Sequence, residues 1–191
     1  MDFEEMMKNK FTISIVIIII IAGAFAVYKF MTKRDESKTD SYPIYTKNEE
    51  IINITLYFGS EDSDEFIIES REIYKTKLSV NQAKQAILKL IEGPNNENAS
   101  PVIPKDTKLR ELYVENGHAY IDFSKEISEN HPGGSKAESA TIGSIVNTLI
   151  KNFSDIKDVQ ILVEGKVIDT LAGHIDIRQP FKETAEIKNK D

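Results

Sequence analysis

Hydrophobic and polar positions follow two different patterns along the chain. Residues 11–31 form an almost unbroken apolar run, which begins after a short N-terminal tail, residues 1–10. Residues 51–181 alternate short apolar stretches with polar turns, as a folded domain does. Residues 32–50 and 182–191 are polar and charged without periodicity, which indicates a flexible linker and a disordered C-terminal tail. The pattern therefore predicts one folded domain behind one apolar segment.

Within the predicted domain, β-branched and aromatic runs indicate strands, and apolar spacings of three and four indicate helices. Residues 79–82 and 135–138 have the form Ser-x-x-Gln/Glu and are interpreted as capping boxes that begin two helices. Gly93 should end the first helix. Residues 59–64 are predicted as a turn and residues 95–104 as a polar loop. The predicted strands are residues 51–58, 66–74, 109–115, 118–123 and 159–163, with 167–171 as a candidate short strand and 173–181 as a candidate edge segment.

The order of these elements indicates the fold class. Asn116 and Gly117 separate two of the strands, and this dipeptide suits the two positive-φ positions of a type I′ hairpin turn. Tight turns between consecutive strands favour antiparallel pairing. We therefore predict an α+β domain of order ββαββαβ, with a mainly antiparallel sheet and two helices on one face, preceded by one transmembrane helix.

The apolar run is long enough to cross a bilayer. Eighteen to twenty residues of helix span roughly 27–30 Å. The alternative is a cleaved signal peptide, since Ala26 ends an Ala-Phe-Ala site and lysines precede the run. We favour an uncleaved single-pass anchor, because the apolar run continues past that site. Lys8 and Lys10 precede the run, and Lys29, Lys33 and Arg34 lie at its end, so charge alone does not predict the orientation.

Composition excludes several kinds of chemistry. The chain has 24 Lys+Arg against 31 Asp+Glu, and this acidic balance disfavours nucleic-acid binding. It has no cysteine, which excludes disulfides, thiol catalysis, cysteine-ligated metals and a lipid-modified cysteine. It has no tryptophan either, which weakens any interpretation as a protein that stacks on sugars.

The remaining candidate residues are few. His118, His131 and His174 are the only histidines, and His174 with Asp176 would share one face of a strand as a minimal metal site. No spacing typical of metal or nucleophile motifs supports this site, so surface or hydrogen-bonded histidines are the favoured interpretation. We assign no catalytic, cofactor-binding or metal-binding residue, expect no cofactor, and predict that the protein is not an enzyme.

Two further groups of residues have structural interpretations. Gly133 and Gly134 precede a predicted helix, but they lack the spacing of a phosphate-binding loop. Glu69 and Arg71 would lie on one face of a strand, where each could pair with a residue of a helix or of a neighbouring strand, so we predict a structural ion-pair role for them.

The order and spacing of several short segments resemble a known family. These segments are residues 56–58, 69–71, 86–94, 103–104, 114–124, 145–149, 159–165 and 173–174. Together they resemble the GerMN domain, over residues 51–181. The resemblance implies a non-catalytic module of sporulation and spore germination in the envelope of endospore-forming bacteria, with a part in assembling a complex that bridges two membranes. The chain departs from the sporulation lipoprotein of this family by having one module and an isoleucine-rich anchor.

We therefore predict a single-pass cell-membrane protein whose C-terminal domain lies outside the cytoplasm, or a secreted form after cleavage near Ala26. The expected partners are envelope or sporulation-complex proteins and, through the N-terminal helix, the membrane, with peptidoglycan nearby and no nucleic acid. The alternatives are a cell-wall-associated hydrolase and a ligand-sensing envelope domain. A sheet edge at residues 66–74 or 173–181 is the predicted docking element. Proline at Ile67 or Ile175 should then impair partner recruitment more than stability.

Overall fold

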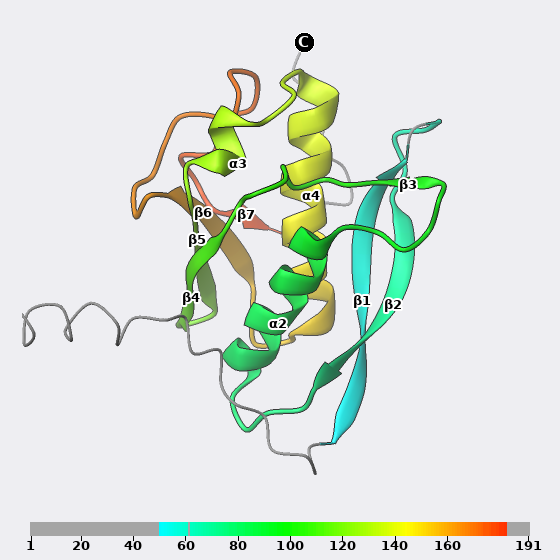
Figure 1. Cartoon of the computed structure of the whole chain (residues 1–191). Coiled ribbons are helices and arrows are strands. Elements are labelled where there is room, and N and C mark those ends of the chain that lie inside the picture. The colour runs from blue at the N-terminus through cyan, green and yellow to red at the C-terminus, as the bar shows by residue number, and fades with distance from the viewer. Residues whose placement is uncertain (1–49, 61, 183–191) are drawn as a thin grey trace, which may run out of the picture. The chain divides into compact units, whose positions relative to one another are not determined.

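A computed structural model describes residues 50–60 and 62–182, and these residues form an α+β domain (Figure 1). The α+β class is therefore confirmed. The predicted anchor, most of the predicted linker and most of the predicted tail lie outside the described residues. In chain order the elements are β1 Ile51–Ser60, β2 Ile67–Tyr74, α2 Ser79–Glu92, β3 Ala99–Ser100, β4 Leu109–Glu115, β5 His118–Phe123, α3 Glu126–Glu129, α4 Ser135–Asn152, β6 Asp158–Val163 and β7 Phe181–Lys182.

The strands form two sheets, so the predicted single sheet with both helices on one face is wrong. The first sheet has the order β2-β1-β3 and is antiparallel. The second has the order β4-β5-β6-β7, in which β5 and β6 are parallel. Helices α2 and α4 lie between the two sheets and contact strands of both (Figure 1). The parallel pair follows from the long helical connection between β5 and β6, which returns the chain to the same end of the sheet.

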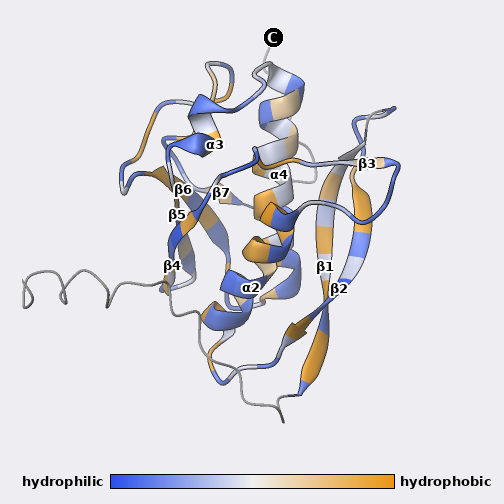
Figure 2. Cartoon of the chain, in the orientation of Figure 1, coloured by the Kyte–Doolittle hydropathy of each residue, from blue (hydrophilic) through white to orange (hydrophobic). Residues whose placement is uncertain are grey.

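The core lies where the helices meet both sheets. Hydrophobic and polar residues alternate along much of β1 (Figure 2). Its residues Ile54, Leu56 and Phe58 are buried in the core. The apolar stripes predicted for the helices are largely buried as well. The residues of these stripes that are buried are Ala83, Ile87, Leu90, Ile142, Ile145, Val146 and Leu149, with Phe153 just after α4.

The segment predicted as a polar loop, residues 95–104, is more ordered than its composition indicates. Ser100 and Ala99 of β3 pair with Gly59 and Ser60, which lengthens β1 beyond its predicted end. Val102, two residues further on, is buried in the core. The cause is tertiary, because β3 has only two residues and exists only through its pairing with β1.

Both predicted capping boxes are wrong. Neither Ser79 nor Ser135 caps its helix, because each lies inside the helix and the flanking residues are Leu78 and Gly134. The Ser79 hydroxyl instead donates to Asp155 Oδ2 at 2.5 Å. By contrast, Gly93 ends α2 as predicted, with a φ of 88°.

The last predicted strands are shorter than expected. Residues 167–171 are not a strand, and only a bridge between Val163 and Lys166 closes the turn after β6. Of the predicted edge segment 173–181, only its last residue is in a strand, β7. Among the described residues, no helix is long and apolar enough to span a membrane.

The predicted hairpin is confirmed. Asn116 and Gly117 connect β4 and β5 with φ values of 54° and 90°.

Replacing Gly117 with valine should lower the free energy of unfolding by about 1–3 kcal/mol, since a β-branched residue resists positive φ. The new Cβ would also lie 3.0 Å from the Lys157 side chain. Thermal melting measures the effect. Gly117→Asn is the matched control and should cost less, because asparagine tolerates positive φ; equal melting temperatures for all three proteins would contradict the prediction.

Candidate functional site

Strand β2 forms one outer edge of the first sheet, as predicted for residues 66–74. The amide of Lys75 donates to the Glu50 carbonyl at 2.7 Å. This bond shows which residues of β2 direct their backbone groups toward β1. Odd-numbered residues of β2 therefore direct their backbone groups toward β1. Ile68, Ser70 and Glu72 direct theirs away from the sheet.

Side chains cover other stretches of open backbone in this sheet. On β1, the amide and carbonyl of Thr55 bond with the Asn152 side chain at 2.8 and 2.7 Å. The Ser144 hydroxyl bonds with the Tyr57 carbonyl. On β2, the Gln85 side chain bonds with both backbone groups of Tyr74, each at 2.9 Å. Within the described part of the chain, no such cover is seen for the outward backbone groups of residues 68–72.

The inner face of β2 carries an ion pair in which the predicted residues pair with each other and not with charged residues of a helix or of another strand. Arg71 donates to Glu69 at 2.7 Å, and the two side chains are only 12% and 9% exposed. Glu69 also accepts from the Asn95 and Asn96 amides, and Arg71 donates to the Gly93 carbonyl at 2.9 Å. This confirms a structural role, because the pair ties β2 to the chain that follows α2.

The ionisation state of Glu69 fits this role. Burial alone would raise the pKa of Glu69, but hydrogen bonds from the Asn96 amide and from Arg71 outweigh it and hold that pKa below its ordinary value. The carboxylate therefore stays charged and paired at neutral pH. The edge strand is thus held from its inner side, while its outer edge is left open.

The outer face of β2 has apolar residues near the start of the strand. Ile68 is 61% exposed. Opposite it on β1, Tyr57 contacts the ring of Phe66 edge-on, with ring centres 6.1 Å apart. Together the open edge and this apolar group form a surface that can pair with a strand and contact its side chains.

The histidines and Asp176 do not form a site. His118 donates to Asp158 at 2.8 Å, and His174 donates to Glu138 at 2.9 Å. Residues 173–180 are not in a strand, so His174 and Asp176 do not share a strand face. Asp176 instead pairs with Arg178 at 2.6 Å, which lowers the pKa of Asp176 to about 2. In residues 50–60 and 62–182, no group of three acidic, histidine or cysteine side chains could hold a metal ion.

His131 belongs to a neutral hydrogen-bond chain. The Gly133 amide donates to its Nδ1 at 3.0 Å, so Nε2 carries the proton and donates to the Thr141 hydroxyl. Thr141 in turn donates to the Val102 carbonyl at 2.5 Å. Burial lowers the pKa of His131, and the nearby Glu138 carboxylate only partly opposes this. Gly133 therefore orients the imidazole of His131.

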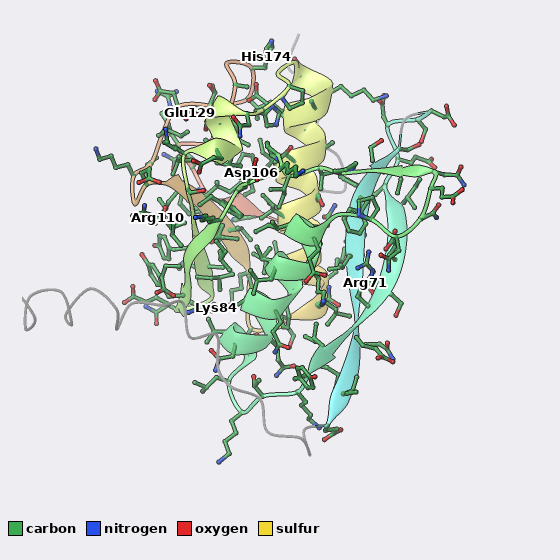
Figure 3. All side chains as sticks on the ribbon, viewed as in Figure 1. Arg71, Lys84, Asp106, Arg110, Glu129 and His174 are labelled. Atoms are coloured by element: carbon green, nitrogen blue, oxygen red, sulfur yellow. The ribbon has the colours of Figure 1, made fainter. Side chains whose placement is uncertain are left out.

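Glu138 is the residue that sequence reasoning missed. Its side chain is completely buried and accepts from the His174 amide at 2.9 Å and from the Ile175 amide at 3.1 Å. Burial by itself would raise the pKa of Glu138, but the bond from His174 and these amides outweigh it and lower that pKa. The signal was its spacing, since Glu138 falls on the same stripe as Ile142 and Ile145. Figure 3 shows His174 far from Arg71, so this cluster is separate from the β2 edge.

Comparisons with known proteins identify the domain. The family model described as "Germane: Sporulation and spore germination" matches residues 55–169. A protein of Clostridium perfringens that is called a lipoprotein is 31% identical over 72% of this chain and 93% of its own, with a TM-score of 0.51. Among curated proteins, no match was found.

Two structures of the Bacillus subtilis sporulation protein GerM share the fold. Its first GerMN domain is 23% identical over 60% of this chain and 84% of its own, with a TM-score of 0.50. Its tandem GerMN domains are 22% identical over 73% of this chain and 51% of theirs, with a TM-score of 0.55. Because the family model matches more than half of its residues, the chain belongs to the Germane family of sporulation and spore germination proteins, and its fold is that of the GerMN domains.

Proposed function

We propose that this protein is a membrane-anchored, extracytoplasmic module of sporulation or spore germination that binds envelope proteins and performs no catalysis. Membership of the Germane family supports the process. The similarity to a protein called a lipoprotein supports a location at a membrane and outside the cytoplasm. Residues 11–31 would supply the anchor and residues 32–50 the linker, in a single-pass cell-membrane protein.

The open edge of β2 is the observation that carries the binding role. Ile68, Ser70 and Glu72 offer three amides and three carbonyls in the plane of an existing sheet. An incoming strand can bond with all of them without rearranging the domain, since Glu69 and Arg71 hold β2 from the other side. We infer that the partner is an envelope or sporulation-complex protein that adds a strand to this edge.

Cysteine crosslinking tests this proposal in cells. The natural chain has no cysteine, so Ile68→Cys creates a single reactive thiol beside the edge. A membrane-impermeant thiol crosslinker added to intact sporulating cells should join this thiol to a specific protein. Val167→Cys is the matched control, because Val167 is similarly exposed, at 51% against 61%, and lies beyond β6.

A thiol in the linker checks the location separately. Ser41→Cys should react with an impermeant reagent in intact cells. Labelling only after lysis would overturn the extracytoplasmic location. Labelling without an Ile68-specific crosslink, or equal crosslinks from Val167→Cys, would leave the location standing and overturn the edge-binding role.

A further inference from the structure

Several exposed apolar residues gather at the end of the domain where the chain enters it. Ile51 begins β1 and lies opposite Tyr74, the last residue of β2. Leu78 follows four residues later and precedes α2. These three residues define the entry end, which is the lower end of the domain in Figure 1.

The exposure of the entry end is unusual for this domain. Ile51 is 55% exposed, Tyr74 42% and Leu78 61%, and these are three of the six most exposed large hydrophobic residues in the described part of the chain. Ile51 and Tyr74 lie opposite each other and Leu78 follows in the connection from β2 to α2, so their exposure indicates a contact surface at this end of the domain.

Charge distinguishes the entry end from the opposite end of β1. Lys75 and Lys77 lie between Tyr74 and Leu78 along the chain, and the Lys75 side chain is half exposed even though it pairs with Glu50. At the far end of β1, the turn toward β2 carries acidic residues, including Asp62 and Asp64. Tyrosine, lysine and aliphatic residues together are typical of segments that lie at a membrane interface.

The short segment between the predicted anchor and the domain favours the membrane surface as the partner of the entry end. Only 19 residues, 32–50, separate the predicted anchor from Ile51. A flexible segment of this length has a root-mean-square span of roughly 22–26 Å. The bilayer surface therefore stays within reach of the entry end at high effective concentration, and even a weak contact would be populated.

We propose that the entry end docks on the lipid surface of the membrane that holds the anchor. This inference rests on the proposed anchor. Ile51, Tyr74 and Leu78 would enter the interfacial region, and Lys77 would lie near anionic headgroups. Because ten strand residues span about 33 Å, the turn between β1 and β2 would point away from the bilayer. The open edge of β2 would then face sideways, toward neighbouring proteins on the same membrane.

Lipid quenching of a single fluorophore tests this docking. The full chain with Leu78→Cys carries an environment-sensitive dye and is reconstituted into vesicles of phosphatidylethanolamine and phosphatidylglycerol with doxyl-labelled lipid. Asp62→Cys is the control, since Asp62 is exposed at the other end of β1. We expect a blue-shifted, strongly quenched dye at position 78 and an unshifted, unquenched dye at position 62.

Two substitutions separate the apolar and charged contributions. Ile51→Ser in the Leu78→Cys chain should reduce the quenching. Lys77→Gln should weaken docking about fivefold on anionic vesicles and leave it unchanged on vesicles of zwitterionic lipid alone.

Flotation of the vesicles distinguishes the two proposals. Protein that floats with the vesicles but shows equal dye spectra at positions 78 and 62 would overturn docking while the anchor stands. A dye at position 78 that is already blue-shifted in lipid-free detergent and stays unquenched in vesicles would mean that the chain itself covers the entry end, and would also overturn docking. Protein that does not float would overturn both the anchor and the docking.

Discussion

Replacing Glu138 with alanine is expected to lower the free energy of unfolding by about 2–4 kcal/mol. The buried carboxylate accepts from the backbone amides of His174 and Ile175 and from the His174 ring. Alanine would leave a cavity and remove the acceptor for these donors. Urea denaturation measures the loss, and hydrogen exchange should show faster exchange at the His174 and Ile175 amides.

Two variants serve as controls for this prediction. Glu138→Gln keeps one acceptor oxygen and should lose about half as much stability. Glu129→Ala removes an exposed carboxylate paired with Lys125 and should change stability by less than about 0.5 kcal/mol. If Glu138→Ala were as stable as Glu129→Ala, the buried carboxylate would not hold this segment.

The same carboxylate gives a dependence on pH. The pKa values of Glu138 and Glu69 are both lowered from 4.5 in the folded protein. The unfolded chain therefore takes up protons first, and the stabilisation is complete above about pH 4.5 and is lost as the pH falls below it. Melting temperatures recorded from pH 7 downward should fall in that range, and the fall should be shallower in Glu138→Gln.

Proline at Ser70 is expected to abolish most partner recruitment while the domain stays folded. The Ser70 amide points away from β1, so proline removes no hydrogen bond of the sheet and should cost only about 1 kcal/mol of stability. The ring would block an incoming strand and remove the central donor of the open edge. Loss of one such bond with the added clash should weaken binding about tenfold or more. Co-purification from sporulating cells and spore yield measure the result, with protein level checked by blot.

The controls for Ser70→Pro come from the structure. Ser70→Thr keeps the amide and should recruit normally. Ile67→Pro should unfold the domain, because the Ile67 amide faces β1, and Ile175 is no edge residue since its amide donates to Glu138. The structure therefore moves the proline test from the two positions predicted from sequence to Ser70. Normal recruitment by folded Ser70→Pro would exclude strand addition at β2.

Histidine substitutions in the same assay address the enzymatic alternative. His118→Ala, His131→Ala and His174→Ala should each leave spore yield and germination nearly intact, since the three side chains bond with separate partners. Loss of function in one of these variants, with the protein folded and abundant, would favour an enzyme over a binding module.

Several features that depend on neighbours in the sequence were predictable, although the two capping boxes were not. The hairpin at Asn116 and Gly117 follows from which residues tolerate positive φ. The buried stripes of α2 and α4 follow from apolar spacing. The shared face of Glu69 and Arg71 follows from the two-residue period of a strand, but only the structure shows that they pair with each other.

The strand edges were only partly predictable. Residues 66–74 were a correct candidate, because β2 lies at an edge. Which amides of β2 point away from β1 depends on how the two strands pair. A shift of one residue in their register would turn the outward amides inward and the inward amides outward. The same limit applies to β3, whose two residues carry no strand signal of their own.

The sequence by itself determined the α+β class, helices α2 and α4, the turn at Gly117 and the family resemblance, since each depends on local sterics, apolar spacing or the order of short segments. Only the tertiary structure decided that the hairpins belong to two sheets, that Glu138 is a buried acceptor and not a cap, and that β2 keeps an open edge. Glu138 and His174 are 36 positions apart, and Thr55 and Asn152 are 97 apart. Such partners form their hydrogen bonds only after the whole chain has packed. No local pattern in the sequence therefore predicts which residues will be partners.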